Sequence, residues 1–320
     1  MIEHRFAHPV VDAAQLGAAP LSVRLLSDDY VLWRDGAGTP RAALDRCPHR
    51  GTRLSLGRVC GGELECAYHG WRFAGNGRCV AMPAQPGFAA PDSHGLAMRP
   101  VTEAMGLLWL QPEGDSARLP PFDADADVRL RKLNVGPYDV ATSAPRIVEN
   151  FLDMAHFGFV HEGLLGDRGH GEVPAYQATV DAAGMQARGC RAWQPQSNRL
   201  SAAGSWVDYD YDVGAPYAAM LRKAPDALAG YREAIALFIC PIEPEASRVW
   251  FRMAVPDMQS SDEQLREFQD RIFMQDRPVL ESQRPRRLPL SGGEVHGVAD
   301  RSSSAYRRYL KGLGITFGVC

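Results

Sequence analysis

The sequence contains no run of about twenty consecutive apolar residues, the minimum for a helix that crosses a membrane. Nor does it begin like a secretory leader, because charged residues interrupt the apolar residues between Met1 and Gly17. Neither sign of charge is in large excess: 35 basic residues face 38 acidic ones, and the net charge of −3 argues against a nucleic-acid partner. We expect a cytoplasmic protein that binds neither membranes nor nucleic acid.

Cysteine is also scarce, and its seven residues are an odd number, so a disulfide framework is not expected in a chain of 320 residues. Hydrophobic residues make up 45% of the sequence, which is enough to bury the cores of two domains. Residues 114–127 are rich in proline and aspartate and have the composition of a linker. We therefore predict one domain at 1–113 and another at 114–320.

The pattern of apolar residues predicts a fold of the α+β class. In the first domain, short apolar runs alternate with turns, as in a small antiparallel β domain; they lie at 23–26, 30–33 and 106–110. The second domain combines strands such as 248–255 with two predicted helices, at 147–160 and 262–283. Residues 260–262, with the sequence Ser-Ser-Asp, are good amino-terminal caps for the second helix.

Two cysteine–histidine pairs carry the strongest chemical signal. Cys47 precedes His49 by two residues, and Cys66 precedes His69 by three, so each pair can occupy one loop tip. This arrangement suits a [2Fe–2S] cluster in which two cysteines bind one iron and two histidines bind the other. A zinc site is the alternative, but zinc fingers usually pair cysteine with cysteine and histidine with histidine. We predict the cluster, with a potential raised by its neutral histidine ligands.

A second pair of histidines, His156 and His161, indicates a mononuclear metal site. Residues five apart on an ideal helix diverge by about 140°, so the predicted helix must loosen between them, and Gly158 is the expected place. A two-histidine, one-carboxylate site for Fe(II) with open positions for dioxygen needs one acidic ligand. Asp153, one helical turn before His156, is better placed to hydrogen-bond the outer nitrogen of that imidazole than to reach the metal.

The predicted helix at 262–283 offers the third ligand. Asp276 lies about 20° from Leu265 around the helix axis and therefore falls within an apolar stripe. The other members of the stripe are Phe268, Ile272 and Val279. A carboxylate that faces a core is costly unless a cation compensates it. We predict Asp276 as the metal ligand, with a salt bridge to an arginine near Arg277 as the competing explanation.

In combination these motifs resemble those of the Rieske-type non-haem iron oxygenases. The segments that carry the resemblance are Arg46–Gly51, Cys66–Trp71, Asn150-x-x-Asp153-x-x-His156-x₄-His161, and Gln275–Arg277 with Glu281–Gln283. The resemblance implies a Rieske β-sandwich domain and a helix-grip catalytic domain, an antiparallel sheet with a long helix. It also implies that Asn150 supports the iron ligands. In the homotrimer expected for the family, Asp153 would link a cluster histidine of one subunit to His156 of another.

The length of the chain and its opening His8-Pro9-Val10 are similar to the demethylating members of this family. The resemblance implies monooxygenation, either hydroxylation or demethylation, of a small aromatic, heteroaromatic or alkaloid-like substrate. Dioxygen would be the co-substrate, and electrons from NAD(P)H would arrive through a separate reductase or ferredoxin. A cis-dihydroxylating ring dioxygenase is the alternative. A Rieske electron carrier or a zinc-binding protein fits less well, because a second ligand set follows the cluster motif.

Overall fold

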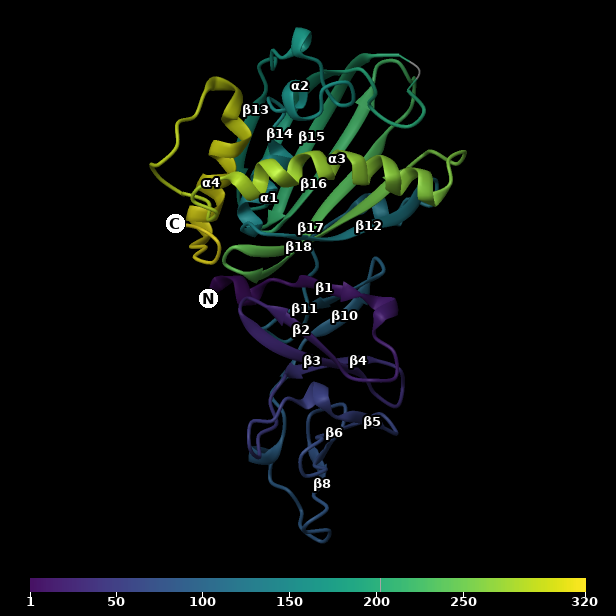
Figure 1. Cartoon of the computed structure of the whole chain (residues 1–320), viewed down its shortest axis with the longest axis vertical. Coiled ribbons are helices and arrows are strands. Elements are labelled where there is room, and N and C mark those ends of the chain that lie inside the picture. Colours follow the sequence, from purple (N-terminus) through teal and green to yellow (C-terminus); the bar gives the residue numbers. More distant parts are fainter. Residues whose placement is uncertain (202) are drawn as a thin grey trace. The chain divides into compact units, whose positions relative to one another are not determined.

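A computed structural model describes residues 1–201 and 203–320 of the chain (Figure 1). The chain divides into two compact units. One unit comprises His4–Leu119, and the other comprises Met1–Glu3 together with Pro120–Cys320. The division falls inside the predicted linker at 114–127. No helix in the described parts of the chain has both the length and the apolarity that a membrane crossing requires.

The unit His4–Leu119 is built from three small antiparallel sheets. The first has the order β1-β11-β10, formed by His8–Asp12, Leu107–Leu110 and Val101–Ala104. The second has the order β2-β3-β4-β9, formed by Leu21–Leu25, Asp28–Arg34, Pro40–Leu44 and Met98–Arg99. The predicted apolar runs lie in these two sheets and contribute to the core of the unit, where Leu32, Trp33 and Trp109 are fully buried.

The third sheet of this unit supports the two cysteine–histidine loops. Its order is β5-β6-β7-β8, formed by Arg58–Cys60, Glu63–Glu65, Arg72–Phe73 and Cys79–Ala81. One loop follows β4, and the other connects β6 to β7. Leu54, Leu64 and Phe73 are fully buried in one cluster with Cys47 and Cys66, so a small apolar core packs against the two loops.

The unit that contains Pro120–Cys320 is organised around one antiparallel sheet of seven strands, with the order β12-β18-β17-β16-β15-β14-β13. Its strands are Arg131–Val140, Ala246–Val255, Glu233–Glu243, Ala218–Pro225, Ser205–Ala215, Gly184–Gln194 and Gln177–Asp181. Helix α3, Asp262–Ser282, runs across this sheet (Figure 1), and α4 is Arg301–Leu313. The core lies between the sheet and the helices, where apolar residues of both are buried together.

Helix α3 begins and ends close to the positions that the sequence predicts. Ser261 caps it: its hydroxyl accepts from the Gln264 N–H, and the Gln264 side chain accepts from the Ser261 N–H. Most of the predicted stripe is buried, but Val279 is 41% exposed, and Leu280 is fully buried in its place. The departure occurs just after Pro278, which lies inside the helix and cannot donate a backbone hydrogen bond.

The prediction of a single helix at 147–160 was wrong, because the structure has two helices in this region. Helix α1 covers Ala144–Leu152, and the short α2 covers Phe157–Val160. The break comes at Asp153, which is extended and accepts the Ala155 N–H at 2.7 Å, a local bond that competes with the helix. Gly158 lies within α2 rather than at the break. A Cβ there would lie 3.0 Å from the Asp167 carbonyl oxygen, so its role is close packing.

Candidate metal centres and substrate pocket

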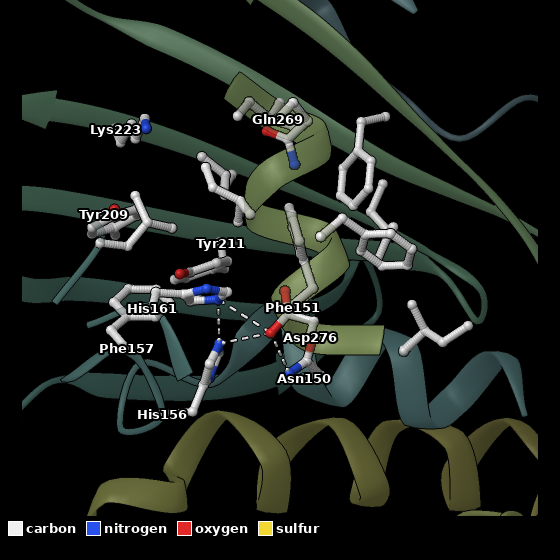
Figure 2. A pocket seen from close by; sticks show the side chains of 18 residues that line it. Asn150, Phe151, His156, Phe157, His161, Tyr209, Tyr211, Lys223, Gln269 and Asp276 are labelled. Atoms are coloured by element: carbon white, nitrogen blue, oxygen red, sulfur yellow. Dashed lines mark hydrogen bonds and ion pairs between the residues drawn. The ribbon is translucent and has the colours of Figure 1, made fainter. Parts of the chain in front are cut away.

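Three ligand-type side chains from α2 and α3 meet at one point (Figure 2). His156 precedes α2 directly, His161 follows it directly, and Asp276 projects from α3. The two Nε2 atoms are 3.1 Å apart, and Asp276 Oδ1 lies 3.4 Å from His156 Nε2 and 3.1 Å from His161 Nε2. The turn of α2 therefore overcomes the divergence expected for residues five apart on an ideal helix.

The outer nitrogens of both imidazoles contact acceptor oxygens. His156 Nδ1 lies 3.3 Å from Asp153 Oδ2, as the sequence predicts. His161 Nδ1 lies 2.9 Å from Gln275 Oε1, a contact that sequence reasoning missed although Gln275 belongs to the same motif as Asp276. A tautomer whose Nδ1–H donates outward leaves the Nε2 lone pair of each ring able to bind a metal where the three side chains meet.

Two imidazole nitrogens and a carboxylate oxygen directed at one another can hold a metal cation between them. The donor set, two imidazoles and one carboxylate, fits non-haem Fe(II) with open coordination positions. Asn150 Nδ2 donates to Asp276 Oδ1 at 3.3 Å and so helps to orient the carboxylate. The competing salt bridge does not form, because Arg277 pairs with Glu281 and not with Asp276.

A largely apolar pocket opens beside these three residues. Apolar side chains dominate its walls: Ile147, Phe151, Phe157, Leu165, Leu221, Ile235, Leu237, Phe251, Ile272 and Phe273. Besides the three ligand-type residues, its polar lining consists of Asn150, Tyr209, Tyr211, Lys223 and Gln269 (Figure 2).

Sequence reasoning assigned no role to the polar residues of the strands. Tyr209 and Tyr211 lie two residues apart on β15 and therefore face the same side of the sheet. Both rings line the pocket. The alternation between Val207 and Val213 was the signal available in the sequence. Burial raises the pKa of Tyr211 well above its usual value, so this hydroxyl stays protonated and can donate a hydrogen bond.

The two cysteine–histidine loops in the other unit have matching backbones. The Gly51 N–H donates to the Cys47 carbonyl at 2.9 Å, and the Gly70 N–H donates to the Cys66 carbonyl at 3.0 Å. Both glycines have a positive φ, 75° and 67°, which a residue with a side chain rarely adopts. The same tight turn is therefore built twice, once for each half of the predicted cluster site.

The side chains of these loops separate by type. Both thiols are buried, at 2% and 3% exposure, whereas His49 and His69 are exposed with ring centroids 4.5 Å apart. Burial, with the neighbouring Cys66 thiol, raises the pKa of Cys47 to about 11, so a bound metal is needed to keep a thiolate there. Two sulfurs inside and two imidazoles outside fit the two unlike irons of a Rieske cluster.

Comparison with known protein families agrees with this geometry. The family model described as the Rieske [2Fe-2S] domain matches residues 7–96. The model described as the vanillate O-demethylase oxygenase C-terminal domain matches residues 140–314, which is more than half of the chain. The match to the second model contains α2, α3 and all three converging ligand-type residues.

Individual relatives cover nearly the whole chain. The methylxanthine N1-demethylase NdmA of Pseudomonas putida is 32% identical over 316 residues, 96% of this chain and 88% of the relative. Its solved structure with caffeine aligns with a TM-score of 0.86 at 30% identity, covering 97% of this chain and 90% of that one. A solved dicamba monooxygenase has a similar fold, with a TM-score of 0.81 at 22% identity, covering 98% of this chain and 97% of that one.

These similarities confirm the predicted α+β combination of a Rieske domain with an oxygenase domain, and they exclude the zinc-binding and simple electron-carrier alternatives. They also support the two kinds of iron centre as the cofactors of the chain. The relatives that match over most of this chain are demethylases. The protein belongs to the Rieske-type non-haem iron oxygenases, and it is a monooxygenase of that family.

Proposed function

We propose that this monooxygenase removes a methyl group from nitrogen or oxygen of a small aromatic or heteroaromatic compound, or hydroxylates such a compound. The supporting observation is the convergence of His156, His161 and Asp276 beside a largely apolar pocket. The relatives named for methylxanthine and dicamba demethylation support the substrate class.

In this proposal His156, His161 and Asp276 hold Fe(II), while Cys47, His49, Cys66 and His69 hold the [2Fe–2S] cluster. Bound iron, with electrons that enter through the cluster, supplies the activation of dioxygen for insertion of one oxygen atom into a C–H bond. Dioxygen is the co-substrate, and NAD(P)H supplies the electrons through a separate reductase or ferredoxin.

The side chains of the protein position the metal ligands and the substrate, and they shield the site from water. Asp153 and Gln275 hold the outer nitrogens of the two imidazoles, and Asn150 holds the carboxylate of Asp276. Phe151, Phe157 and the other apolar walls exclude water and place a methyl or ring carbon next to the three ligand-type residues. Geometry of this kind decides which carbon reacts.

We further propose that the active form is a homotrimer in which Asp153 carries electrons between subunits. Asp153 Oδ2 already contacts His156 Nδ1, and its side chain remains 30% exposed, which leaves it reachable by a histidine from a second chain. The proposed electron path would then run from an exposed cluster histidine of one subunit through Asp153 to His156 of its neighbour.

Metal counting and product identification test the proposal together. The purified protein should contain about three irons per chain, and His161→Ala should contain about two while keeping the visible absorption of the cluster. Incubation with a reductase, NADH and N-methyl or O-methyl aromatic compounds should release one formaldehyde per methyl group lost. A cis-diol product, or full iron content in the His161 variant, would refute the proposed site and reaction.

A further inference from the structure

A buried ion pair contains one of the polar residues that line the pocket. Lys223 on β16 lines the pocket, and its Nζ lies 2.6 Å from Glu233 Oε1 on the neighbouring strand β17, where the two residues are register partners. Their side chains are only 6% and 3% exposed. Nζ also donates to the Ser197 carbonyl, and the Tyr231 hydroxyl donates to Glu233 Oε2 at 2.6 Å. Figure 2 labels Lys223 among the side chains that line the pocket.

The charges of Lys223 and Glu233 cancel while Nζ is protonated. Burial lowers the pKa of Lys223 to about 7, and loss of this proton would leave only the negative charge of Glu233. Among the described residues that line the pocket, Lys223 is the one lysine or arginine and Asp276 the one carboxylate. A negatively charged substrate would therefore find no unpaired cation at Lys223, and burying an unpaired carboxylate is costly.

Donor groups nevertheless remain available in the pocket. A lysine ammonium has three N–H groups, and in the described part of the chain Nζ has two partners, the Ser197 carbonyl and the Glu233 carboxylate. The Tyr211 hydroxyl is fully buried and has no hydrogen-bond partner among the described residues. A buried donor without a partner is destabilising until an acceptor arrives. An uncharged ligand with a carbonyl oxygen would satisfy such a donor without bringing a charge.

We infer that the substrate is an uncharged methylated aromatic or heteroaromatic compound whose carbonyl oxygen accepts a hydrogen bond from Lys223, and that Glu233 makes the pocket reject aromatic carboxylates. This inference rests on the proposed function, because it specifies the substrate class of the same pocket. The inference predicts that methoxybenzoic acids are not substrates. They are similar in size to the corresponding neutral amides and carry the same methoxy group, but they have a negative charge.

The test compares two compounds of nearly the same size and shape, one neutral and one negatively charged. Binding of 3-methoxybenzamide and 3-methoxybenzoate to the iron-loaded protein, and of caffeine as a neutral bicyclic compound, is measured by calorimetry at pH 7.5 without reductase. Wild-type protein should bind the amide at least tenfold more tightly than the acid. Tighter binding of the acid would overturn the inference and leave the oxygenase assignment intact. Absence of binding by all three compounds would instead overturn the proposed substrate class.

Two variants identify the residues responsible. Glu233→Gln leaves Lys223 without its counter-charge and should tighten binding of 3-methoxybenzoate about tenfold, which corresponds to about 1.4 kcal/mol, while binding of the amide changes less than threefold. Tyr231→Phe is the matched control, because it removes a hydrogen bond to Glu233 but no charge. Unchanged binding of the acid by Glu233→Gln would contradict the role of Glu233.

The double variant Lys223→Met with Glu233→Gln removes both charges and leaves neither buried alone. It should weaken binding of 3-methoxybenzamide about tenfold and give no gain for the acid. Retained affinity for the amide would contradict the role of Lys223. Cluster absorption and iron content serve as the folding check for every variant, and the wild-type comparison of amide with acid decides the inference even if a variant does not fold.

Discussion

At the scale of single residues, helical periodicity is the most informative pattern in the sequence. Asp276 falls on the apolar stripe of α3 and is 7% exposed, as expected for a carboxylate that faces the core. Its proximity to His156 and His161 depends on another segment of the chain. Gln275, its neighbour in sequence, contacts the outer nitrogen of His161, and nothing in the local pattern indicates that contact.

Gln275→Leu should weaken iron binding at the mononuclear site by about 10- to 100-fold, because His161 Nδ1 loses the acceptor that orients its ring. Iron retained after dialysis against a chelator measures the effect, and the cluster absorption should not change. Gln275→Glu keeps an acceptor oxygen at the same place and is the matched control. Equal iron retention by the leucine and glutamate variants would show that the contact does not orient the ligand.

Asp153→Asn should leave both metal sites filled but reduce substrate oxidation by about a hundredfold, because the uncharged amide is a poorer bridge between His156 and a cluster histidine. Iron content, cluster absorption and product formation are measured in parallel. Asp115→Asn, at an exposed position in the other unit, is the control for a change of one charge. Full turnover in the Asp153 variant would refute the proposed electron path.

At the scale of elements, close backbone packing helps to fix the position of the short helix α2. A Cβ at Gly166 would lie 2.2 Å from the Phe157 carbonyl carbon and 2.4 Å from the Gly158 nitrogen, both in α2. Any side chain at Gly166 must therefore displace the turn that precedes His161. The sequence contains this glycine, but the approach of the 166 backbone to α2 is a tertiary contact.

Gly166→Ala should lose the mononuclear iron while retaining the cluster, since displacement of α2 separates His161 from Asp276. Iron content per chain and cluster absorption distinguish the two centres. Gly312→Ala in α4 is the matched control, because a Cβ there meets nothing within 4 Å, and it should raise stability by about 0.5–1 kcal/mol. A Gly166→Ala protein with about three irons per chain would contradict this account of α2.

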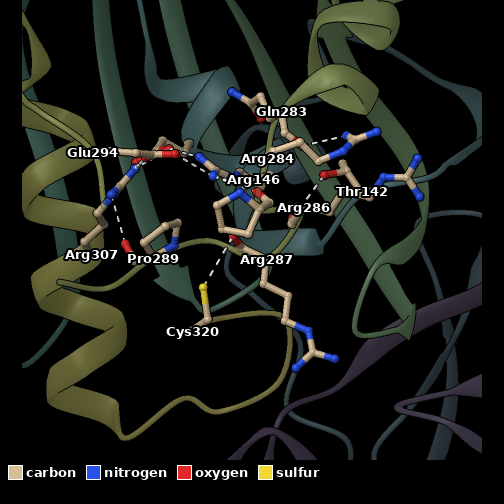
Figure 3. Close-up of polar contacts among 12 residues, drawn as sticks. Thr142, Arg146, Gln283, Arg284, Arg286, Arg287, Pro289, Glu294, Arg307 and Cys320 are labelled. Atoms are coloured by element: carbon tan, nitrogen blue, oxygen red, sulfur yellow. Dashed lines mark hydrogen bonds and ion pairs between the residues drawn. The ribbon is translucent and has the colours of Figure 1, made fainter. Parts of the chain in front are cut away.

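At the scale of the molecule, a charged network connects segments that are far apart in the sequence of the second unit. Arg146 of α1 and Arg307 of α4 both contact the carboxylate of Glu294 (Figure 3). Arg307 also forms two hydrogen bonds with Glu149. Burial opposes ionisation of Glu294, but hydrogen bonds from the two arginines outweigh it and hold its pKa below the usual value.

The depressed pKa of Glu294 makes the stability of this unit depend on pH. A carboxylate with a lowered folded-state pKa stabilises the fold above its unfolded-state pKa of about 4.3, and this contribution is lost as the pH falls through the folded-state value. Glu294→Gln should therefore cost about 2 kcal/mol at pH 7, and the difference from wild type should shrink below about pH 4. Urea unfolding at several pH values measures it.

Glu267→Gln is the control for this prediction, because Glu267 is exposed and lies outside the network. It should change the urea midpoint little at any pH. A difference between Glu294→Gln and wild type that stayed constant from pH 7 to pH 3.5 would show that the effect comes from packing rather than from the charge of Glu294.

The sequence alone determined what local patterns encode: the loop spacing of the cysteine–histidine pairs, the α+β class, the cap of α3 and the buried face of that helix. These depend on residues within one or two turns of one another. The pattern predicted a single helix at 147–160 because a hydrogen bond from a backbone N–H to a side chain, such as that from Ala155 to the Asp153 carboxylate, leaves no periodic signal.

Only the tertiary structure decided which distant residues meet. The register of β16 against β17 pairs Lys223 with Glu233, and the packing of α3 beside α2 brings Asp276 within 3.4 Å of both imidazoles. The physical reason is that these contacts join segments separated by many residues, so their geometry depends on how strands and helices pack together. The kinds of residue that bind a metal can be recognised from short stretches of sequence, whereas the charge and shape of the pocket depend on the assembled sheet.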